Sequence, residues 1–149
     1  MFLLVASLVE VSNVRVFGNL LFLEGPPGTG AVVMEIGTSE ALSISMALRG
    51  ERFWRPLSHD LMVSIVRLSG LRPLKVEIYD LKDGAYLARI HLVKPLFFWV
   101  KHHVVLDSRP SDAVAFALRA GIPIYVSRHL LRTPEEMFSP PSPPVRIEG

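Results

Sequence analysis

The sequence predicts an α+β fold in which a unit of three strands and two helices occurs twice. Short runs rich in Val, Leu, Ile and Phe have the spacing expected of strands, and segments with apolar residues at helical spacing follow them. In addition, Val32–Ala41 aligns without a gap with Val104–Ala113, and acidic residues and serines match within the alignment. Such internal similarity indicates a duplicated unit.

The first unit is expected to contain three strands followed by two helices. Turn residues Ser12 and Asn13 separate the first two strands, and the Gly- and Pro-rich loop Gly25–Gly30 separates the second from the third. Gly50 and Gly70 follow the helical segments, as glycine commonly does at helix C-termini. The expected strands are Phe2–Val11, Val14–Glu24 and Val32–Ile36, and the expected helices are Thr38–Arg49 and Ser58–Ser69.

The second unit is expected to begin with a hairpin, because Lys82–Gly84 has the composition of a tight turn between two alternating segments. A helix beginning at Pro110 is expected to end before Gly121. Ser127 is expected to cap a short final helix. The expected strands are Leu74–Leu81, Tyr86–Val93, His103–Asp107 and Ile124–Val126, and the expected longer helix is Pro110–Ala120.

Half of the 149 residues are hydrophobic and only 20% are charged, against about 45–50% and about 25% in average chains. Strands that are covered on both faces lack polar positions. The excess is therefore explained if the strands of both units merge into one strongly curved, barrel-like mixed sheet with the helices outside. We expect a single domain over residues 1–132, with units at about 1–70 and 74–132. Residues 133–149 hold five of the twelve prolines and are expected to form a flexible tail.

Composition excludes several classes of protein. The chain has no cysteine, which excludes disulfides, thiolate catalysis and Cys-ligated zinc and favours a cytoplasmic location. The N-terminal apolar run Met1–Val9 has nine residues, fewer than the ~20 of a membrane-spanning helix, so no membrane association is expected. The net charge of +2 is too small to require a nucleic-acid partner. However, twelve of the sixteen basic residues are Arg, which suits bidentate contacts with carboxylate or phosphate.

Three polar clusters are expected where a strand or loop enters a helix. Helix N-termini present free N–H groups and a positive dipole, and they favour anions. Carboxylates bind hard cations such as Mg²⁺ or Mn²⁺, whereas Arg binds phosphate through paired donors. A metal and a phosphate-binding group together are what phosphodiester hydrolysis requires. The clusters are Glu35–Glu40, Arg55–Asp60 and Asp107–Asp112.

At these positions the sequence resembles the bifunctional nuclease (BFN) domain family. The similar motifs are Ile36–Ala41, Arg55–Leu61 and Asp107–Ala113, followed by Pro123–Val126, and the resemblance spans roughly residues 32–131. The resemblance implies an α+β fold with a duplicated unit, frequent self-association, and nuclease activity toward DNA and RNA. The chain departs from the family at Lys94–His103, which is aromatic and basic where many relatives have a polar, often acidic loop.

The leading hypothesis is a nuclease that hydrolyses phosphodiester bonds in DNA or RNA with the help of Mg²⁺ or Mn²⁺. The metal would be held by carboxylates, the phosphate by Arg side chains, and a histidine, whose unperturbed pKa suits the task, would move the proton. The candidates are His59, Asp60 and Asp107 for catalysis; Arg55, Arg109 and Ser111 for substrate binding; and Glu40, Asp107 and Asp112 for the metal.

Each candidate also has a structural alternative. First-turn acids such as Glu40 and Asp112 can simply satisfy free N–H groups of their helices. Adjacent helical residues do not face each other, so His59 would pair with Asp107 or Asp112 across the fold rather than with its neighbour Asp60. Otherwise the first turn of that helix would only hold Arg55. Both candidate arginines can form buried ion pairs with the nearby acids instead of binding phosphate.

The second hypothesis is a non-enzymatic, homo-oligomeric regulatory module that binds nucleic acid or another ligand. In that case the three motifs form an Arg–carboxylate framework that joins the two units. Phe97, Phe98 and Trp99 are expected to form an apolar patch through which a dimer or trimer assembles, because aromatic residues are enriched at interfaces. Stacking on nucleic-acid bases is the alternative role for these aromatics.

Overall fold

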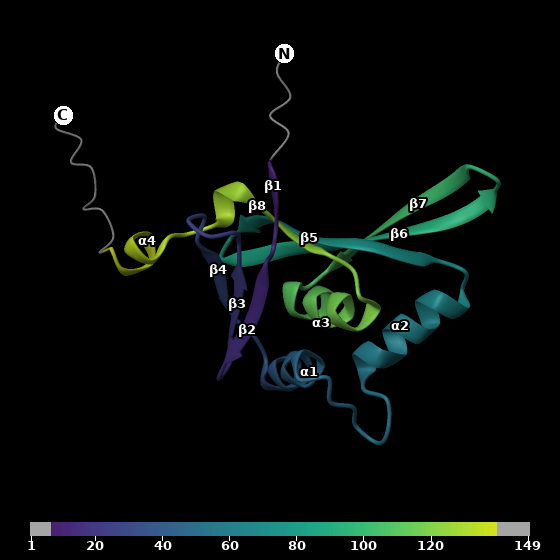
Figure 1. Cartoon of the computed structure of the whole chain (residues 1–149), viewed down its shortest axis with the longest axis horizontal. Coiled ribbons are helices and arrows are strands. Elements are labelled where there is room, and N and C mark those ends of the chain that lie inside the picture. Colours follow the sequence, from purple (N-terminus) through teal and green to yellow (C-terminus); the bar gives the residue numbers. More distant parts are fainter. Residues whose placement is uncertain (1–6, 140–149) are drawn as a thin grey trace, which may run out of the picture.

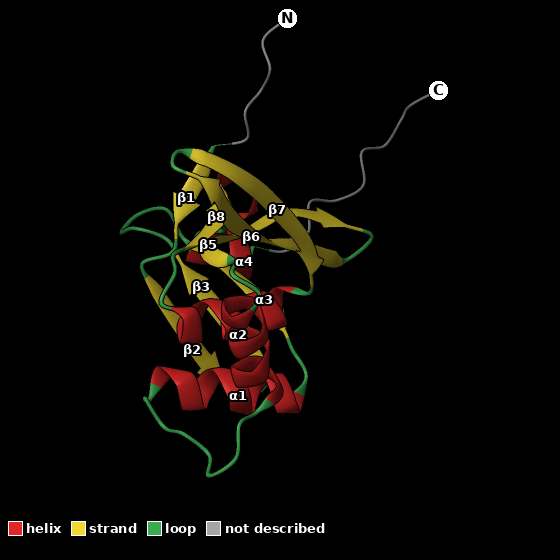
Figure 2. Cartoon of the chain, turned by 90° about the vertical axis from the view of Figure 1, so that its right-hand side faces the viewer, coloured by secondary structure: helices red, strands yellow, loops and turns green. Residues whose placement is uncertain are grey.

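The computed structural model describes residues 7–139 and confirms a mixed α+β fold (Figures 1 and 2). Eight strands, four α-helices and one 3-10 helix follow one another in this part of the chain. In order, they are β1 (Leu8–Glu10), β2 (Asn13–Phe17), β3 (Leu20–Glu24), β4 (Ala31–Glu35), α1 (Thr38–Leu48), α2 (Ser58–Leu68), β5 (Arg72–Lys82), β6 (Ala85–Phe97), β7 (Val100–Ser108), α3 (Pro110–Ala120), β8 (Ile124–Ser127), η1 (Arg128–Leu130) and α4 (Pro134–Phe138).

The strands form two sheets rather than the single barrel-like sheet that the sequence predicted. One sheet has five strands in the order β1-β8-β5-β6-β7, and the other has three in the order β2-β3-β4. The chain changes sheets between β1 and β2. The N–H of Val11 donates to Ile124 at the edge of β8, whereas the N–H of the next residue, Ser12, donates to Glu24 of β3. Because consecutive residues pair with different sheets, the two sheets meet at a corner.

Both halves contain a three-strand antiparallel meander followed by a helix. In the first half this is β2-β3-β4 and α1, and in the second half it is β5-β6-β7 and α3. The internal alignment of Val32–Ala41 with Val104–Ala113 falls on the same strand-to-helix junction in each half. The expected strand Val14–Glu24 is instead a hairpin that turns at Gly18, where φ is +59° and a residue without Cβ is favoured.

Helix α3 lies at the centre of the packing, in contact with α1, α2 and one face of the five-stranded sheet (Figure 1). Six of its eleven residues are buried, including the fully buried Ala113, Ala115 and Ala117. Small side chains let neighbouring backbones approach closely, and Phe116 belongs to the same buried core cluster as Ile90 and Leu92 of β6. The core is therefore shared by the helices and the concave side of the large sheet.

The ends of the described segment depart in part from expectation. Within the expected tail, Pro134–Phe138 forms α4, whose first turn is capped by the Thr133 hydroxyl accepting from the N–H of Glu136. Residues 140–149, and residues 2–6 of the first expected strand, lie outside the described residues. Among residues 7–139, no helix is both long enough and apolar enough to span a bilayer.

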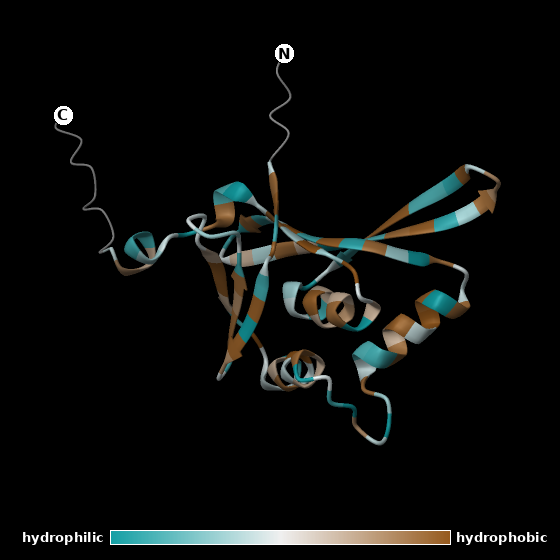
Figure 3. Cartoon of the chain, viewed as in Figure 1, coloured by the Kyte–Doolittle hydropathy of each residue, from teal (hydrophilic) through white to brown (hydrophobic). Residues whose placement is uncertain are grey.

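The β6–β7 hairpin extends beyond the helices, and hydrophobic residues lie at its tip (Figure 3). The side chains of these residues are exposed. At the turn, Phe98 takes a left-handed conformation with φ +38°. The exposed fractions of Phe97, Phe98 and Trp99 are 76%, 95% and 85%. These aromatics contribute almost nothing to the core of the chain, so the hydrophobic excess of the sequence is only partly explained by burial.

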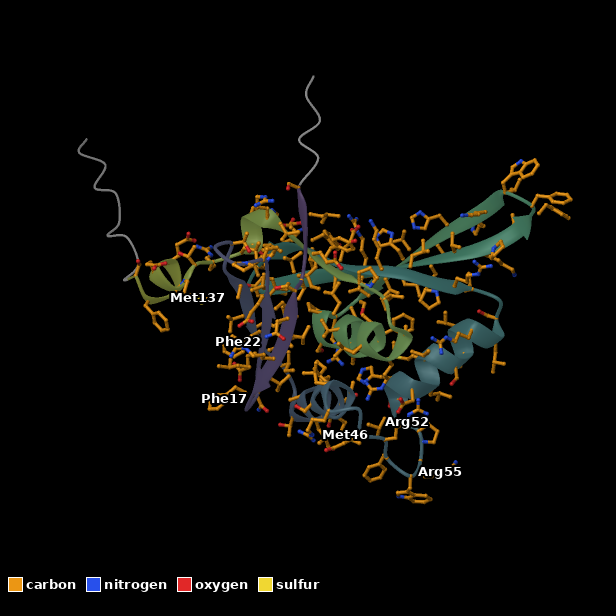
Figure 4. The ribbon with its side chains drawn as sticks, in the orientation of Figure 1. Phe17, Phe22, Met46, Arg52, Arg55 and Met137 are labelled. Atoms are coloured by element: carbon orange, nitrogen blue, oxygen red, sulfur yellow. The ribbon has the colours of Figure 1, made fainter. Side chains whose placement is uncertain are left out.

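We predict that Phe116→Ala lowers the free energy of unfolding by about 3–5 kcal/mol, because it removes a fully buried aromatic ring and leaves a cavity. Phe17→Ala is the matched control. Phe17 is 79% exposed (Figure 4), and its loss should change the free energy of unfolding by less than about 0.5 kcal/mol. Denaturant unfolding measures both values, and equal losses in the two variants would contradict the packing described here.

Candidate functional site

Polar side chains from the first turns of the three long helices form one network of contacts. Glu40 comes from the first turn of α1, His59 from α2 and Asp112 from α3. The sequence placed all three at helix starts, and the structure brings them together. We call these three residues, together with Ser43 and Arg109, the helix-junction cluster.

The buried end of the helix-junction cluster is a Ser–His–Asp arrangement. His59 Nδ1 lies 2.6 Å from Ser43 Oγ, and His59 Nε2 lies 2.9 Å from Asp112 Oδ1. The pairing of His59 with Asp112, one of the two partners considered from sequence, is therefore present. However, Ser43 and His59 are only 4% and 7% exposed, so the hydroxyl is not placed to attack a substrate. This end of the cluster holds α1, α2 and α3 together.

The outer end of the cluster is formed by Arg109. Its Nε donates to Asp112 Oδ2 at 2.8 Å, and its Nη2 donates to Glu40 Oε1 at 3.1 Å. The Arg109 side chain is 68% exposed, whereas the two acids are mostly covered. Burial raises the pKa of Asp112, but the hydrogen bonds from Arg109 and His59 outweigh it and lower the pKa. Asp112 is therefore ionised at neutral pH.

Asp60 belongs to a second, neighbouring contact. Its Oδ1 accepts from Arg119 Nε at 2.9 Å, and its Oδ2 accepts from the N–H of Leu57 at 2.9 Å. Arg119 also donates to the carbonyls of Ser43 and Ala115. The adjacent residues His59 and Asp60 thus reach different partners near opposite ends of α3, and they do not form a dyad.

Three other predicted residues lie apart from the helix-junction cluster. Asp107 is an exposed residue of β7 whose backbone pairs with Arg89, and it has no side-chain hydrogen bond or ion pair among residues 7–139. Arg55 is on the exposed loop between α1 and α2, 6.0 Å from the centre of the Trp54 ring (Figure 4). Ser111 is 7% exposed within α3.

The predicted metal ligands do not form a metal site in this arrangement. Glu40 and Asp112 both bind Arg109, and Asp107 is two residues along the chain from Arg109 without joining them. In the described part of the chain, no group of three or more His, Asp or Glu side chains is arranged to hold a metal ion. In this arrangement Arg109 occupies the position between Glu40 and Asp112 that a metal ion would need, and Asp107 does not join them.

One groove lies next to Asp60, near the helix-junction cluster, and another lies at α4, away from that cluster. A polar groove of about 410 Å³ is lined by Asp60 together with Arg52, Arg67 and Arg119. A larger, mostly apolar groove of about 690 Å³ lies between the small sheet and α4 and includes Phe22 and Met137 (Figure 4). Asp60 is the one predicted site residue that lines either groove.

A second polar cluster, on the five-stranded sheet, was not identified from sequence. Glu77 of β5 is only 3% exposed and accepts from Lys75 Nζ at 2.8 Å and from Arg89 Nε at 2.7 Å. Burial raises the pKa of Glu77, but the contacts with Lys75, Arg89 and His91 outweigh it and lower the pKa to about 2. We call this group, with His91 and His103, the sheet-face cluster.

The two histidines extend this cluster from β6 to β7. His91 Nε2 is 3.2 Å from Glu77 Oε2, without good hydrogen-bond geometry, and it has no other hydrogen-bond partner among residues 7–139. His91 Nδ1 lies 3.0 Å from His103 Nε2, and the two rings stack with centres 5.1 Å apart. Burial lowers the pKa of His91 despite the opposing effect of Glu77. His103 is exposed.

The family of this chain is shown by comparison with known proteins. Residues 21–138 match the bifunctional nuclease domain, and the chain belongs to this family. An uncharacterized protein of Mycobacterium tuberculosis is 36% identical over 112 residues, which cover 75% of this chain and 63% of that protein. Bifunctional nuclease 1 of Oryza sativa subsp. japonica is 29% identical over 99 residues, or 66% of this chain and 28% of that protein. The chain thus spans less than two thirds of either relative.

We predict that Arg119→Ala destabilises the protein far more than Arg109→Ala. Arg119 is 11% exposed, and its loss removes one donor each from Asp60 and from the carbonyls of Ser43 and Ala115, at a cost of about 3 kcal/mol. Arg109 is 68% exposed, so its loss should cost about 1 kcal/mol or less. Denaturant unfolding of the two Arg→Ala variants measures the difference. A large cost for Arg109→Ala would mean that Arg109 is part of the structural framework.

Proposed function

We propose that this chain is a nuclease that cleaves phosphodiester bonds in DNA or RNA. The membership of the bifunctional nuclease family and the printed name of the rice relative support this function. The structural observation that supports it best is the position of Arg109, an exposed guanidinium held in place by two carboxylates at the start of a buried helix. Such a group is suited to the recognition of a phosphate.

Arg109 retains the capacity to bind a phosphate while it holds its two acids. Its Nε and one Nη2 contact are used within the chain, and the other donors of the planar guanidinium are left for a ligand. The start of α3 adds a positive dipole. Because Glu40 and Asp112 fix the orientation of the guanidinium, little side-chain entropy is lost when phosphate binds.

The contacts of His59 favour a positioning role over the proton transfer that the sequence suggested. Both of its ring nitrogens are within hydrogen-bond distance of protein partners, and the ring is buried. In this arrangement His59 is a positioning residue, which holds Asp112 and through it Arg109. Direct proton transfer by His59, and metal binding by Glu40, Asp107 and Asp112, stay predictions.

We predict that the purified chain cleaves single-stranded DNA or RNA and that Arg109→Ala lowers kcat/KM roughly 10- to 100-fold, the loss of one charge-assisted phosphate contact. Arg49→Ala, which removes another exposed arginine that is paired with a carboxylate, should leave kcat/KM nearly unchanged. Gel-based cleavage assays with Mg²⁺, with Mn²⁺ and with chelator measure this. Absence of cleavage in all three conditions would overturn the proposed function, and equal effects of the two variants would remove Arg109 from it.

A second candidate function, a homo-oligomeric binding module, is supported by the tip of the β6–β7 hairpin. The tip segment Leu96–Val100 exposes five neighbouring apolar side chains at the end of a projecting hairpin (Figure 3). Exposed apolar patches of this kind mark interaction surfaces. A nuclease can assemble through this patch only if its substrate-binding site stays open in the assembly. The oligomeric state is therefore measured separately from cleavage.

We predict that the chain forms a dimer or trimer and that Trp99→Ser shifts it toward the monomer. Trp54→Ser is the matched control, because both tryptophans are 85% exposed and only one lies on the hairpin tip. Sedimentation velocity over a range of protein concentrations measures the mass of each variant. A monomeric wild type, or equal shifts in both variants, would contradict assembly through the tip.

A further inference from the structure

The helices α2 and α3 lie on one face of the five-stranded sheet (Figure 1). The alternation along its strands places the sheet-face cluster on the other face. The alternation along β5 and β6 places Val76, Ile78, Ile90 and Leu92 in the core. Glu77 and His91 alternate with these residues and therefore point to the opposite face. In the described part of the chain, none of the helices α1–α3 lies over that face.

The sheet-face cluster is an ordered path from a buried carboxylate to an exposed imidazole. It runs from Glu77 Oε2 to His91 Nε2 over 3.2 Å and from His91 Nδ1 to His103 Nε2 over 3.0 Å. Glu77 and His91 are 3% and 8% exposed, whereas His103 is exposed. Within the part of the chain that the structure describes, His91 Nε2 has no other hydrogen-bond partner, so a small movement toward Glu77 would complete the path.

This order determines which nitrogen of each neutral ring carries the proton. The ionised carboxylate of Glu77 favours a proton on His91 Nε2, which leaves a lone pair on His91 Nδ1. That lone pair accepts from His103 Nε2–H, and the remaining lone pair of neutral His103 is then on Nδ1. A proton taken up at His103 Nδ1 is stabilised through the stacked His91 ring by the negative charge of Glu77.

We propose that His103 is the catalytic residue that accepts a proton from the attacking water in phosphodiester cleavage, with His91 and Glu77 as positioning residues. This inference rests on the proposed nuclease function and deepens it. The water gives one proton to His103 Nδ1, its oxygen bonds to phosphorus, and the bond from phosphorus to one sugar oxygen breaks. The leaving oxygen takes a proton from solvent, and His103 later releases its proton to solvent.

The surroundings of His103 suit a negatively charged substrate. The side chain of Arg89 is 41% exposed and uses Nε for Glu77, and Lys101 precedes His103 by two residues on the same face of β7. Arg109 follows His103 by six residues, about 20 Å in an extended chain, which is the length of a few nucleotides. The charged and titratable groups on this face are Glu10 of β1, Arg72, Lys75, Glu77, Tyr79 and Asp80 of β5, Arg89 and His91 of β6, Lys101, His103 and Asp107 of β7, and Tyr125 of β8.

The deciding experiment compares His103→Gln with His102→Gln in the full chain. Gln can still donate a hydrogen bond to His91 but cannot accept a proton, so His103→Gln should lower kcat by roughly 100-fold or more. His102 is the neighbouring residue on the opposite face of the same strand, so its replacement should leave kcat within about twofold. Both residues are exposed, and unchanged melting temperatures would show that the two variants fold.

The pH profile and the tautomer of His103 provide independent readouts. Any rise of kcat with pH that the wild type shows should be absent in His103→Gln. Imidazole ¹⁵N shifts should show His103 protonated on Nε2 when neutral. Cleavage by the wild type that survives His103→Gln, or a neutral His103 protonated on Nδ1, would overturn this inference and leave the nuclease function in place. A wild type without cleavage under any metal condition would instead overturn the proposed function, and this inference with it.

Discussion

Helix α3 is enclosed by α1, α2 and the large sheet, and this enclosure determines where the polar groups can lie. Alanines on its inner surface let the neighbouring elements approach, and no room is left for solvent along most of its length. Polar side chains near its two ends must therefore find partners within the protein. Asp112 near the start pairs with His59, and Arg119 near the end pairs with Asp60. The first turn of α2 is thus fixed across α3 by two contacts.

The same constraint separates two faces with different chemistry. On the helix side, the paired groups of the helix-junction cluster become progressively less buried from Ser43 to Arg109, and only Arg109 is largely exposed. On the other side, Glu77 and His91 are buried by their neighbours on the sheet, and His103 is exposed at the end of the path. Strand β7 carries His103 and leads directly into Arg109. A nucleic acid that follows this strand and passes around its end at Ser108 would contact both groups, and this relation unites the two proposals.

Local sequence predicted the three long helices and one cross-fold contact, His59 with Asp112, but it missed the β2–β3 hairpin and α4. The match of Val32–Ala41 with Val104–Ala113 located the two strand-to-helix junctions, and helix geometry excluded a His59–Asp60 dyad in favour of a cross-fold partner. The division into two sheets depends on the N–H groups of Val11 and Ser12, which donate to strands of different sheets. No local sequence pattern indicates these partners. The sheet-face cluster had a signal in the alternation of Lys75, Glu77 and Tyr79, but its meaning needed the pairing of β5, β6 and β7. Asp107 is close to Arg109 in sequence, but no ion pair joins the two side chains, and the partners of Arg109 are Glu40 and Asp112.

The central claim is that nucleic acid binds along β7, between the hairpin tip and the start of α3. The most direct measurement is an NMR titration of the isotope-labelled chain with a short single-stranded oligonucleotide, which follows backbone amides and His and Arg side chains. The account predicts that the largest shifts occur at Lys101, His103 and Arg109. Shifts confined to the polar groove lined by Arg52 and Arg67, or no shifts at saturating oligonucleotide, would contradict it.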